Sequence, residues 1–316
     1  MKYFIILMTI FFSSGCSSKS AENEEITIKI MKVQWTGVSI KSEIISEIIT
    51  ALGYDVEINT VSVTLAFRAL ASGHGHVFVG AWFPTMKEIS APFVENGYVK
   101  NLSINMTEAK YTLAVPTFCF ERGLRHFSDI HRFKDELGKR IHGIEKGNDG
   151  NTIIEKMIKS DYFNLGDFKL ESSSEAGMIA AVKKSISENK CIVFLGWSPH
   201  PMNRSIKMNY LKGSDEKTFG ANDGTSEVHT MVNSKFIETH PELKKLLKNM
   251  VFSIDLMNDI MVELHNEKVD IMRSVLRVLD NKPEVLQSWL KDIKTRKGKP
   301  ALPAVQTHFK NLKFQR

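Results

Sequence analysis

The 316-residue chain has few cysteines and, after its amino terminus, no long hydrophobic run. No later apolar stretch approaches the roughly 20 residues that a membrane-spanning helix needs, which argues against an integral membrane protein. The sequence also lacks a nucleophile elbow, a phosphate-binding loop, a zinc-protease motif and a paired-carboxylate signature. Internal repeats, low-complexity tracts and coiled-coil heptads are absent too. The chain therefore carries no signature of the common enzyme classes.

Only two cysteines, Cys119 and Cys191, fall in the part of the sequence that is expected to fold. They could pair in an oxidising compartment. Both, however, lie in apolar, strand-like surroundings, where a free cysteine behaves as a small core residue. The sequence favours two buried free thiols. It also leaves open an exported thiol-dependent enzyme, since a cysteine and a histidine could act as nucleophile and base.

The formal net charge of +6 is distributed over helices of mixed sign and is concentrated only at residues 291–299. Such a cluster can bind nucleic acid, but a solvated surface is the simpler interpretation for an exported chain. We therefore expect no nucleic-acid partner. His74 and His76 have a spacing seen in metal sites, but they precede a strand and have no third ligand nearby. No metal or cofactor is expected.

The amino terminus predicts export. Lys2 precedes an apolar run over residues 3–12, and small residues lead to Cys16. This is the layout of a signal peptide over residues 1–15. A cysteine after a small residue resembles the bacterial lipobox, although Ser13 stands where a leucine is usual, so Cys16 is a candidate for lipidation. Residues 16–25 are polar and predict a flexible tether. The expected location is periplasmic or otherwise extracytoplasmic, with a lipid anchor at Cys16 as one alternative and simple cleavage as the other.

Strand and helix patterns alternate along the remaining chain, which predicts an α/β fold with crossover connections and mainly parallel sheets. The alternation of strand and helix patterns begins again after residue 116, which suggests a second α/β lobe inserted in the first. Strands are expected at 26–33, 55–61, 76–82, 111–116, 140–145, 168–173, 191–197 and 229–232. Helices are expected at 39–52, 64–71, 127–137, 152–160, 175–190, 243–256, 263–278 and 283–293.

Three tryptophans, Trp35, Trp82 and Trp197, each follow a short apolar strand and precede turn residues. The carboxyl ends of strands are where open α/β sheets bind ligands. Several large rings delivered to such an edge could wall a cage, and an aromatic cage binds a quaternary ammonium cation through the ring faces. Trp289 lies in a helical pattern and is interpreted as ordinary packing. The sequence therefore predicts a ligand-binding site and indicates no particular reaction.

Eight motifs in order resemble the substrate-binding proteins of glycine betaine and choline ABC transporters, and most closely the choline-binding branch. They are Trp35-Thr-Gly-Val, Leu52-Gly-Tyr-Asp-Val, Leu70-Ala-Ser-Gly, Gly80-Ala-Trp-Phe-Pro-Thr, Tyr111-Thr-Leu-Ala-Val-Pro, Gly143-Ile-Glu-Lys-Gly-Asn-Asp-Gly, Ser173-Ser-Glu-Ala-Gly-Met and Gly196-Trp-Ser-Pro-His. The resemblance implies a two-lobed periplasmic binding protein of type II, with 26–111 plus 223–316 as lobe I and 112–222 as lobe II. It implies a monomer that presents a quaternary amine, choline or glycine betaine, to a membrane permease and its ATPase. A sensory ligand-binding lobe of a regulatory system is a further alternative.

The resemblance also assigns residues. It implies a cage walled by Trp35, Trp82, Tyr111 and Trp197, with Tyr111 near the hinge. Asn148 matches a position that hydrogen-bonds an alcohol, but a helix N-cap or turn role is an equal alternative. His200 could contact the ligand, latch the lobes or make a structural hydrogen bond. Gly37 departs from the choline-binding branch, which carries aspartate there, so the identity of the amine stays open.

Overall fold

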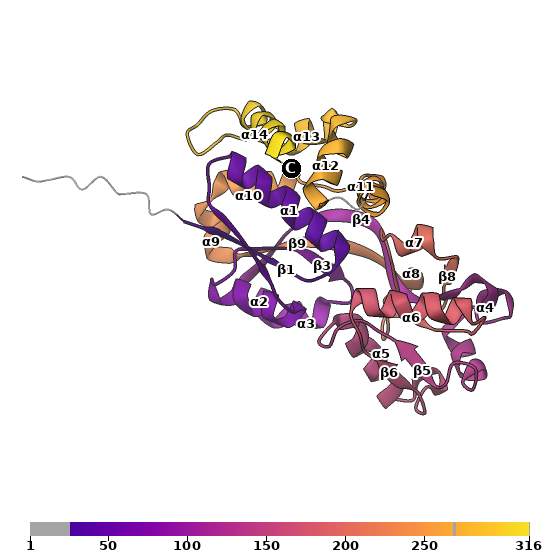
Figure 1. Ribbon diagram of the computed structural model, residues 1–316. Coiled ribbons are helices and arrows are strands. Elements are labelled where there is room, and N and C mark those ends of the chain that lie inside the picture. The colour runs from indigo at the N-terminus through magenta and orange to yellow at the C-terminus, as the bar shows by residue number, and fades with distance from the viewer. Residues whose placement is uncertain (1–25, 268–269, 316) are drawn as a thin grey trace, which may run out of the picture.

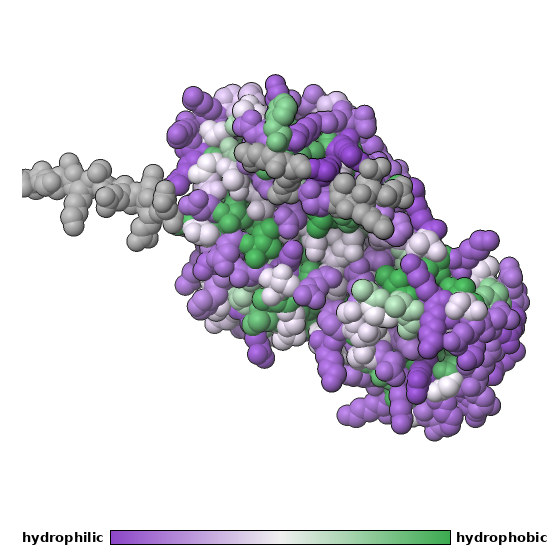
Figure 2. Space-filling view, in the orientation of Figure 1, coloured by the Kyte–Doolittle hydropathy of each residue, from purple (hydrophilic) through white to green (hydrophobic). Residues whose placement is uncertain are grey.

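The computed structural model describes residues 26–267 and 270–315 (Figure 1). The expected signal peptide, tether and Cys16 lie outside the described residues. Across the described ranges, every helix is too short or too polar to cross a membrane. The elements form two groups in Figure 1, a larger one that contains both described ends of the chain and a smaller one built from its middle. The surface on the side shown in Figure 2 is mainly hydrophilic and narrows where the two groups meet.

A single mixed sheet runs through both groups. Its order in the described part of the chain is β2-β1-β3-β9-β4-β7-β5-β6, and β8 pairs with β4. The strands are β1 (Ile28–Lys32), β2 (Val56–Thr60), β3 (Val77–Phe83), β4 (Val99–Pro116), β5 (Arg140–His142), β6 (Lys169–Glu171), β7 (Phe194–Ser198), β8 (Met208–Tyr210) and β9 (Thr225–Asn233). The predicted two-lobed α/β class is confirmed, but the sheet is mixed rather than mainly parallel, because β4 and β9 pair antiparallel with all their neighbours.

The outer strands at both ends of the sheet are parallel: β1 pairs with β2 and β3, and β5 pairs with β6 and β7. The central strands β4 and β9 pair antiparallel with each other and with their other neighbours. The sequence indicated only the last third of β4 as a strand. The whole of β4 spans 18 residues and carries the chain from the larger group into the smaller one.

Helices cover the sheet in both groups (Figure 1). The larger group contains α1 (Thr36–Ala51), α2 (Val63–Ser72), α3 (Lys87–Glu95), α9 (Ser234–Thr239), α10 (Pro241–Asn249), α11 (Ile254–Glu267), α12 (Ile271–Asp280), α13 (Pro283–Trp289) and α14 (Ala301–Gln315). The smaller group contains α4 (Thr117–Glu121), α5 (Asp149–Lys159), α6 (Glu175–Ser187), α7 (Met202–Ser205), α8 (Ala221–Gly224) and the 3-10 helices η1 (Phe127–Phe133) and η2 (Tyr162–Asn164).

Helix α1 lies close to the sheet because of its isoleucines and one glycine. Ile40, Ile44 and Ile48 recur at a spacing of four residues and are fully buried, so they form the apolar face of the helix. Gly80 in β3 permits the close approach, since a Cβ atom there would lie 2.5 Å from a methyl group of Val38. The amino end of α1 is thereby held beside the end of β3, where Trp82 lies.

Three helix predictions were wrong. The segment 243–256 is interrupted after Asn249, whose side chain donates hydrogen bonds to the carbonyls of Trp289 and Lys291. The chain then crosses to β4, where the Phe252 amide donates to the Asn105 carbonyl at 2.8 Å. The segment 263–278 is also divided, and its second part starts at the N-cap Asp270. The hydrophobic periodicity did not reveal these breaks, because the segments on both sides of each break have the pattern of an amphipathic helix. The third is the region 127–137, where residues Phe127–Phe133 form the 3-10 helix η1 rather than an α-helix.

The interpretation of Cys119 and Cys191 as free core thiols was also wrong, because the two sulfurs form a disulfide. Cys119 lies in α4 rather than in a strand, and Cys191 precedes β7, so the bond joins two elements 72 residues apart. Their Cα atoms are 5.6 Å apart, within the usual range for a disulfide. The thiol-dependent enzyme needed one of these sulfurs as a free nucleophile.

Candidate functional site

The four aromatic residues singled out in the sequence line one cavity. Trp35 is the N-cap of α1, Trp82 is near the end of β3, Tyr111 is in β4 and Trp197 is in β7. Trp35, Tyr111 and Trp197 are buried, with 8%, 5% and 6% of their surface exposed, and Trp82 is partly buried. Side chains that are far apart in the sequence thus meet where the two groups of elements join.

Tyr111 is at the centre of the ring arrangement. Its ring centroid is 5.8 Å from that of Trp82 and 6.3 Å from that of Trp197, and the latter pair is nearly perpendicular. Antiparallel pairing of β4 with β7 sets Tyr111 directly opposite Trp197. The buried Phe219 supports the tyrosine edge-on, at 5.6 Å. Rings held at such angles present several faces to a common space, which is the geometry that attracts a cation.

The rest of the cavity wall is apolar apart from one lysine. It consists of Gly37, Val38, Lys41, Met106, Ile144, Pro199 and Met257. No carboxylate is among the lining residues. The cavity therefore offers ring faces and methyl contacts to a ligand, but no acidic side chain that would neutralise a cation.

Asn148 lies beneath this cavity and is not one of its lining residues. It is the N-cap of α5, and its Oδ1 accepts from the Asn151 amide at 3.1 Å. The same oxygen accepts from the Tyr111 hydroxyl at 3.0 Å. Burial raises the pKa of Tyr111 well above its ordinary value of 10.0, so the hydroxyl remains a donor. Asn148 thus has the N-cap role and also orients Tyr111.

Gly150 fixes the distance between Tyr111 and α5. A Cβ atom there would lie 2.1 Å from the Tyr111 hydroxyl oxygen. We expect Gly150→Ala to displace the ring, to lower stability by about 1–3 kcal/mol and to weaken ligand binding, as measured by denaturant unfolding and calorimetry. Adding Tyr111→Phe should restore part of the stability, because the hydroxyl is the closest atom. Equal stability of Gly150→Ala and the native protein would contradict this packing.

Two glutamates of the smaller group hold the amino end of α1. The Trp35 indole N–H donates to Glu145 Oε1 at 2.9 Å. The Thr36 amide donates to Glu175 Oε2 at 3.2 Å, and its hydroxyl donates to Oε1 at 2.5 Å. Helix α1 has no side-chain cap of its own, so the Glu175 carboxylate occupies the position of a cap at the positive end of the helix dipole.

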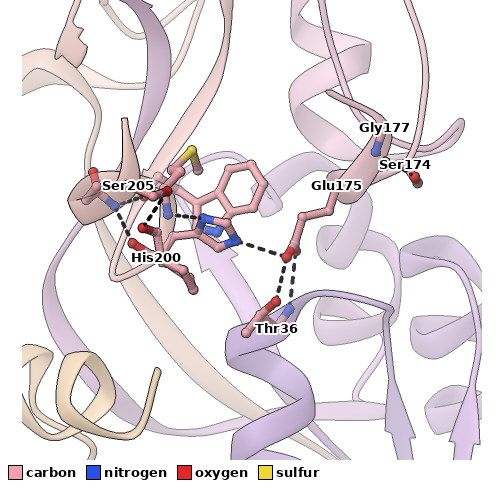
Figure 3. Close-up of polar contacts among 10 residues, drawn as sticks. Thr36, Ser174, Glu175, Gly177, His200 and Ser205 are labelled. Carbon is pink, nitrogen blue, oxygen red and sulfur yellow. Dashed lines mark hydrogen bonds and ion pairs between the residues drawn. The ribbon is translucent and has the colours of Figure 1, made fainter. Parts of the chain in front are cut away.

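His200 completes this contact from the other side. Its Nε2 lies 2.9 Å from Glu175 Oε1, and Figure 3 shows Glu175 between Thr36 and His200. Its Nδ1 accepts from the Met202 amide at 3.1 Å, which makes Nε2 the protonated nitrogen that donates to Glu175. The ring is buried and packs against Trp197 at a tilt of 56°, with centroids 4.7 Å apart. His200 is thus placed behind the aromatic wall rather than among the cavity-lining residues. We call Thr36, Glu175 and His200 the latch.

Burial would raise the pKa of Glu175, but the hydrogen bonds from His200 and Thr36 outweigh it and leave the pKa below its ordinary value of 4.5. Burial raises the pKa of Glu145, and its bond to Trp35 offsets only part of this. A depressed carboxyl pKa means that the interaction is complete above about pH 4.5 and is lost as the pH falls through the lower value. The latch is therefore intact at neutral pH.

We expect Glu175→Gln to weaken ligand binding by about 10- to 100-fold, because charge-assisted hydrogen bonds that hold the closed form contribute about 1.5–3 kcal/mol. Calorimetry at pH 7 measures the loss. Glu171→Gln is the matched control, since Glu171 is an exposed glutamate of the same group of elements. Native binding should also decline below pH 4.5, and the Glu175→Gln variant should lack this component. If both variants bind equally well, the latch does not stabilise the closed form.

Glu145, Glu175 and Lys41 were not assigned a role from the sequence. Glu145 and Glu175 belong to two of the motifs that carry the family resemblance. Glu145 precedes α5 and Glu175 begins α6, and this position near a helix start was the sequence signal for a role. Lys41 had no such signal, because it falls within a helix of mixed composition. His74 and His76 have structural contacts: His74 lies 2.9 Å from Ser72 Oγ, and His76 accepts from the Lys29 amide. No group of three metal-binding side chains occurs among the described residues.

Comparison with known proteins identifies the family. Residues 26–278 match the model described as the substrate binding domain of ABC-type glycine betaine transport systems. The chain belongs to this family. It is the substrate-binding component of a glycine betaine/choline ABC transporter, and such components of importers act outside the cytoplasm. The aromatic residues and both glutamates fall inside the matched range.

Two solved structures and one curated relative support the same family assignment. An ABC-transporter choline-binding protein in complex with choline is 37% identical, with a TM-score of 0.87 over 90% of this chain and 98% of that one. Lactococcal OpuAC, in its closed conformation with glycine betaine, is 25% identical, with a TM-score of 0.74 over 84% of this chain and 99% of that one. The glycine betaine/carnitine transport binding protein GbuC of Listeria monocytogenes is 26% identical over 49% of this chain and 52% of its own length.

Proposed function

We propose that Trp35, Trp82, Tyr111 and Trp197 form a cage that holds a trimethylammonium group between two lobes. The observation that carries this proposal is that all four rings line one cavity. A trimethylammonium group has no hydrogen-bond donor, so ring faces suit it better than directed acceptors do. At about 1–2 kcal/mol for each desolvated ring face, four faces supply several of the roughly 8 kcal/mol that correspond to micromolar affinity.

We place the lobe boundaries at 26–111 plus 223–316 for lobe I and 112–222 for lobe II. Trp35 and Trp82 then belong to lobe I, Trp197 to lobe II, and Tyr111 to the strand that joins them. Neither lobe alone surrounds the cation, so ligand favours the closed form by bridging the lobes. The hydrogen bonds that Trp35 donates to Glu145 and Thr36 donates to Glu175 link the same lobes, which supports coupling between the latch and the cage.

The closed, ligand-bound monomer would be recognised by a membrane permease with its ATPase, and no chemical step is assigned to the site. Export through the signal peptide, with lipidation at Cys16, would keep the protein beside that permease. Globomycin treatment of cells that produce the chain tests the anchor, because it blocks signal cleavage of lipoproteins. Accumulation of the uncleaved form is expected, and normal processing in the presence of the inhibitor would exclude lipidation.

Titration of the purified protein with choline, glycine betaine, carnitine and trimethylamine N-oxide tests the ligand class. At least one should bind with micromolar or tighter affinity and change tryptophan fluorescence, because three of the four tryptophans line the cavity. Glycine and ethanolamine are the unmethylated controls and should bind far more weakly. If no methylated amine binds better than millimolar, the proposed function is wrong.

A further inference from the structure

One wall of the cavity carries a buried lysine. Lys41 follows Gly37 by four residues in α1, so both face the same side of the helix. The two residues line the cavity together with Met257 from α11. Only 2% of the surface of Lys41 is exposed. A cationic side chain thus lies in the wall of a cavity that is otherwise apolar and aromatic.

The ammonium group of Lys41 has an incomplete set of partners. Its Nζ donates to Asn105 Oδ1 at 2.8 Å and lies 5.6 Å from the centre of the Phe252 ring. Asn105 is itself buried, and its Nδ2 donates to the Val79 carbonyl and to Thr230 Oγ1, which fixes its oxygen toward the lysine. An ammonium has three donors, and the described residues provide an acceptor for one of them.

No carboxylate forms an ion pair with Lys41 in the described part of the chain. Burial alone lowers the pKa of Lys41 from 10.5 to about 7, and no neighbouring charge contributes to the shift. Two elements face its ammonium group: β4 presents the Asn105 amide oxygen, and the segment before α11 presents the Phe252 ring. A buried ammonium without a counter-ion is costly, so an anion that entered the cavity would relieve this cost.

The chemistry of the residues that line the cavity suggests what that anion is. The ring faces attract a cation. The α1 wall carries Lys41, whose protonated form a bound carboxylate would favour, and no acidic side chain is among the lining residues. A ligand that is only cationic would gain from the rings but would meet the lysine. A zwitterion with a trimethylammonium group at one end and a carboxylate at the other matches both features.

We propose that Lys41 binds the carboxylate of a zwitterionic methylated amine, so that the cavity prefers the glycine betaine class over choline. The inference rests on the proposed function, because it takes the rings to hold the ammonium end. Hydrogen bonds to charged groups contribute about 1.5–3 kcal/mol, which corresponds to about 10- to 100-fold in affinity.

Calorimetry with glycine betaine and choline, on the native protein and on Lys41→Met, tests this proposal. The native protein should bind glycine betaine at least about tenfold more tightly than choline. Lys41→Met keeps most of the length of the side chain and removes the charge, so it should weaken glycine betaine binding by about 10- to 100-fold while choline binding stays the same or improves. The control is Lys100→Met, which removes an exposed lysine paired with Glu238 and should change neither ligand.

Gly37→Asp provides a second route if Lys41→Met does not fold. A Cβ atom at Gly37 meets only the flexible end of Met261, at 3.4 Å, so the aspartate has room one helical turn from Lys41. It should neutralise the lysine and reduce the preference for glycine betaine by about tenfold or more. A native preference for choline, or an unchanged ratio in both variants, would overturn the assignment of Lys41. Failure of both amines to bind would instead refute the proposed function.

Discussion

Trp82→Ala is expected to reduce the affinity for a quaternary amine by about 30-fold or more. Loss of one desolvated cation–π face removes about 2 kcal/mol, and the methyl groups of the ligand lose their contacts with the same ring. Trp82 is the most exposed of the four rings, so its removal should disturb folding least. Isothermal titration calorimetry measures the affinity, and circular dichroism checks the fold.

Two further variants separate a ring effect from general damage. Trp82→Phe keeps a smaller ring and should lose only part of the affinity. Trp289→Phe alters a fully buried tryptophan that packs against Phe252 in the helical layer and does not line the cavity. It should lower stability and leave the affinity nearly unchanged. Binding by Trp82→Ala that equals native binding would rule out the cage.

Removal of the Cys119–Cys191 disulfide is expected to lower the free energy of unfolding by about 3–5 kcal/mol, because the bond closes a long loop in the unfolded chain. The separation of 72 residues places the effect toward the upper part of that range. The double variant Cys119→Ala/Cys191→Ala measures this in a denaturant titration, and the native protein under a reducing agent is the control.

Ligand binding by the folded double variant should remain within a few-fold of the native value, because neither cysteine lines the cavity. This outcome also distinguishes a binding protein from a thiol-dependent enzyme, which would lose its activity with the sulfur. Unchanged stability after removal of both cysteines would contradict the structural role of the disulfide. Abolished binding by a folded variant would reopen the enzyme alternative.

Much of the fold followed from the sequence because its strands and helices are short, strongly patterned and separated by clear turn residues. The strand β3 and the helix α2, for example, lie within two residues of their expected bounds. The antiparallel centre was not foreseen, since the first part of β4 mixes polar and apolar residues over a long, half-exposed strand. Which strands pair depends on contacts across the whole chain, and a local pattern does not record them.

The aromatic part of the site was predictable because the three tryptophans follow short apolar strands and Tyr111 stands in a motif of the family resemblance. The contacts between side chains that lie far apart in the sequence were not predictable. Glu175 reaches Thr36 from 139 residues away, and Lys41 reaches Asn105 from 64 residues away. Only the folded chain brings these side chains together, so their roles appear when burial and distances are known. The disulfide was missed for the same reason, because apolar surroundings are compatible with both a free and a paired cysteine.

The most direct measurement compares glycine betaine with 3,3-dimethylbutyrate, in which a neutral carbon replaces the nitrogen and the shape and carboxylate are kept. Four ring faces that act on a positive charge should make calorimetric binding of glycine betaine at least about 30-fold tighter. Trp82→Ala should narrow this ratio, because it removes one of the faces. Equal affinities for the two compounds would show that the cavity recognises shape alone, and would contradict the account of a cage for a quaternary ammonium ion.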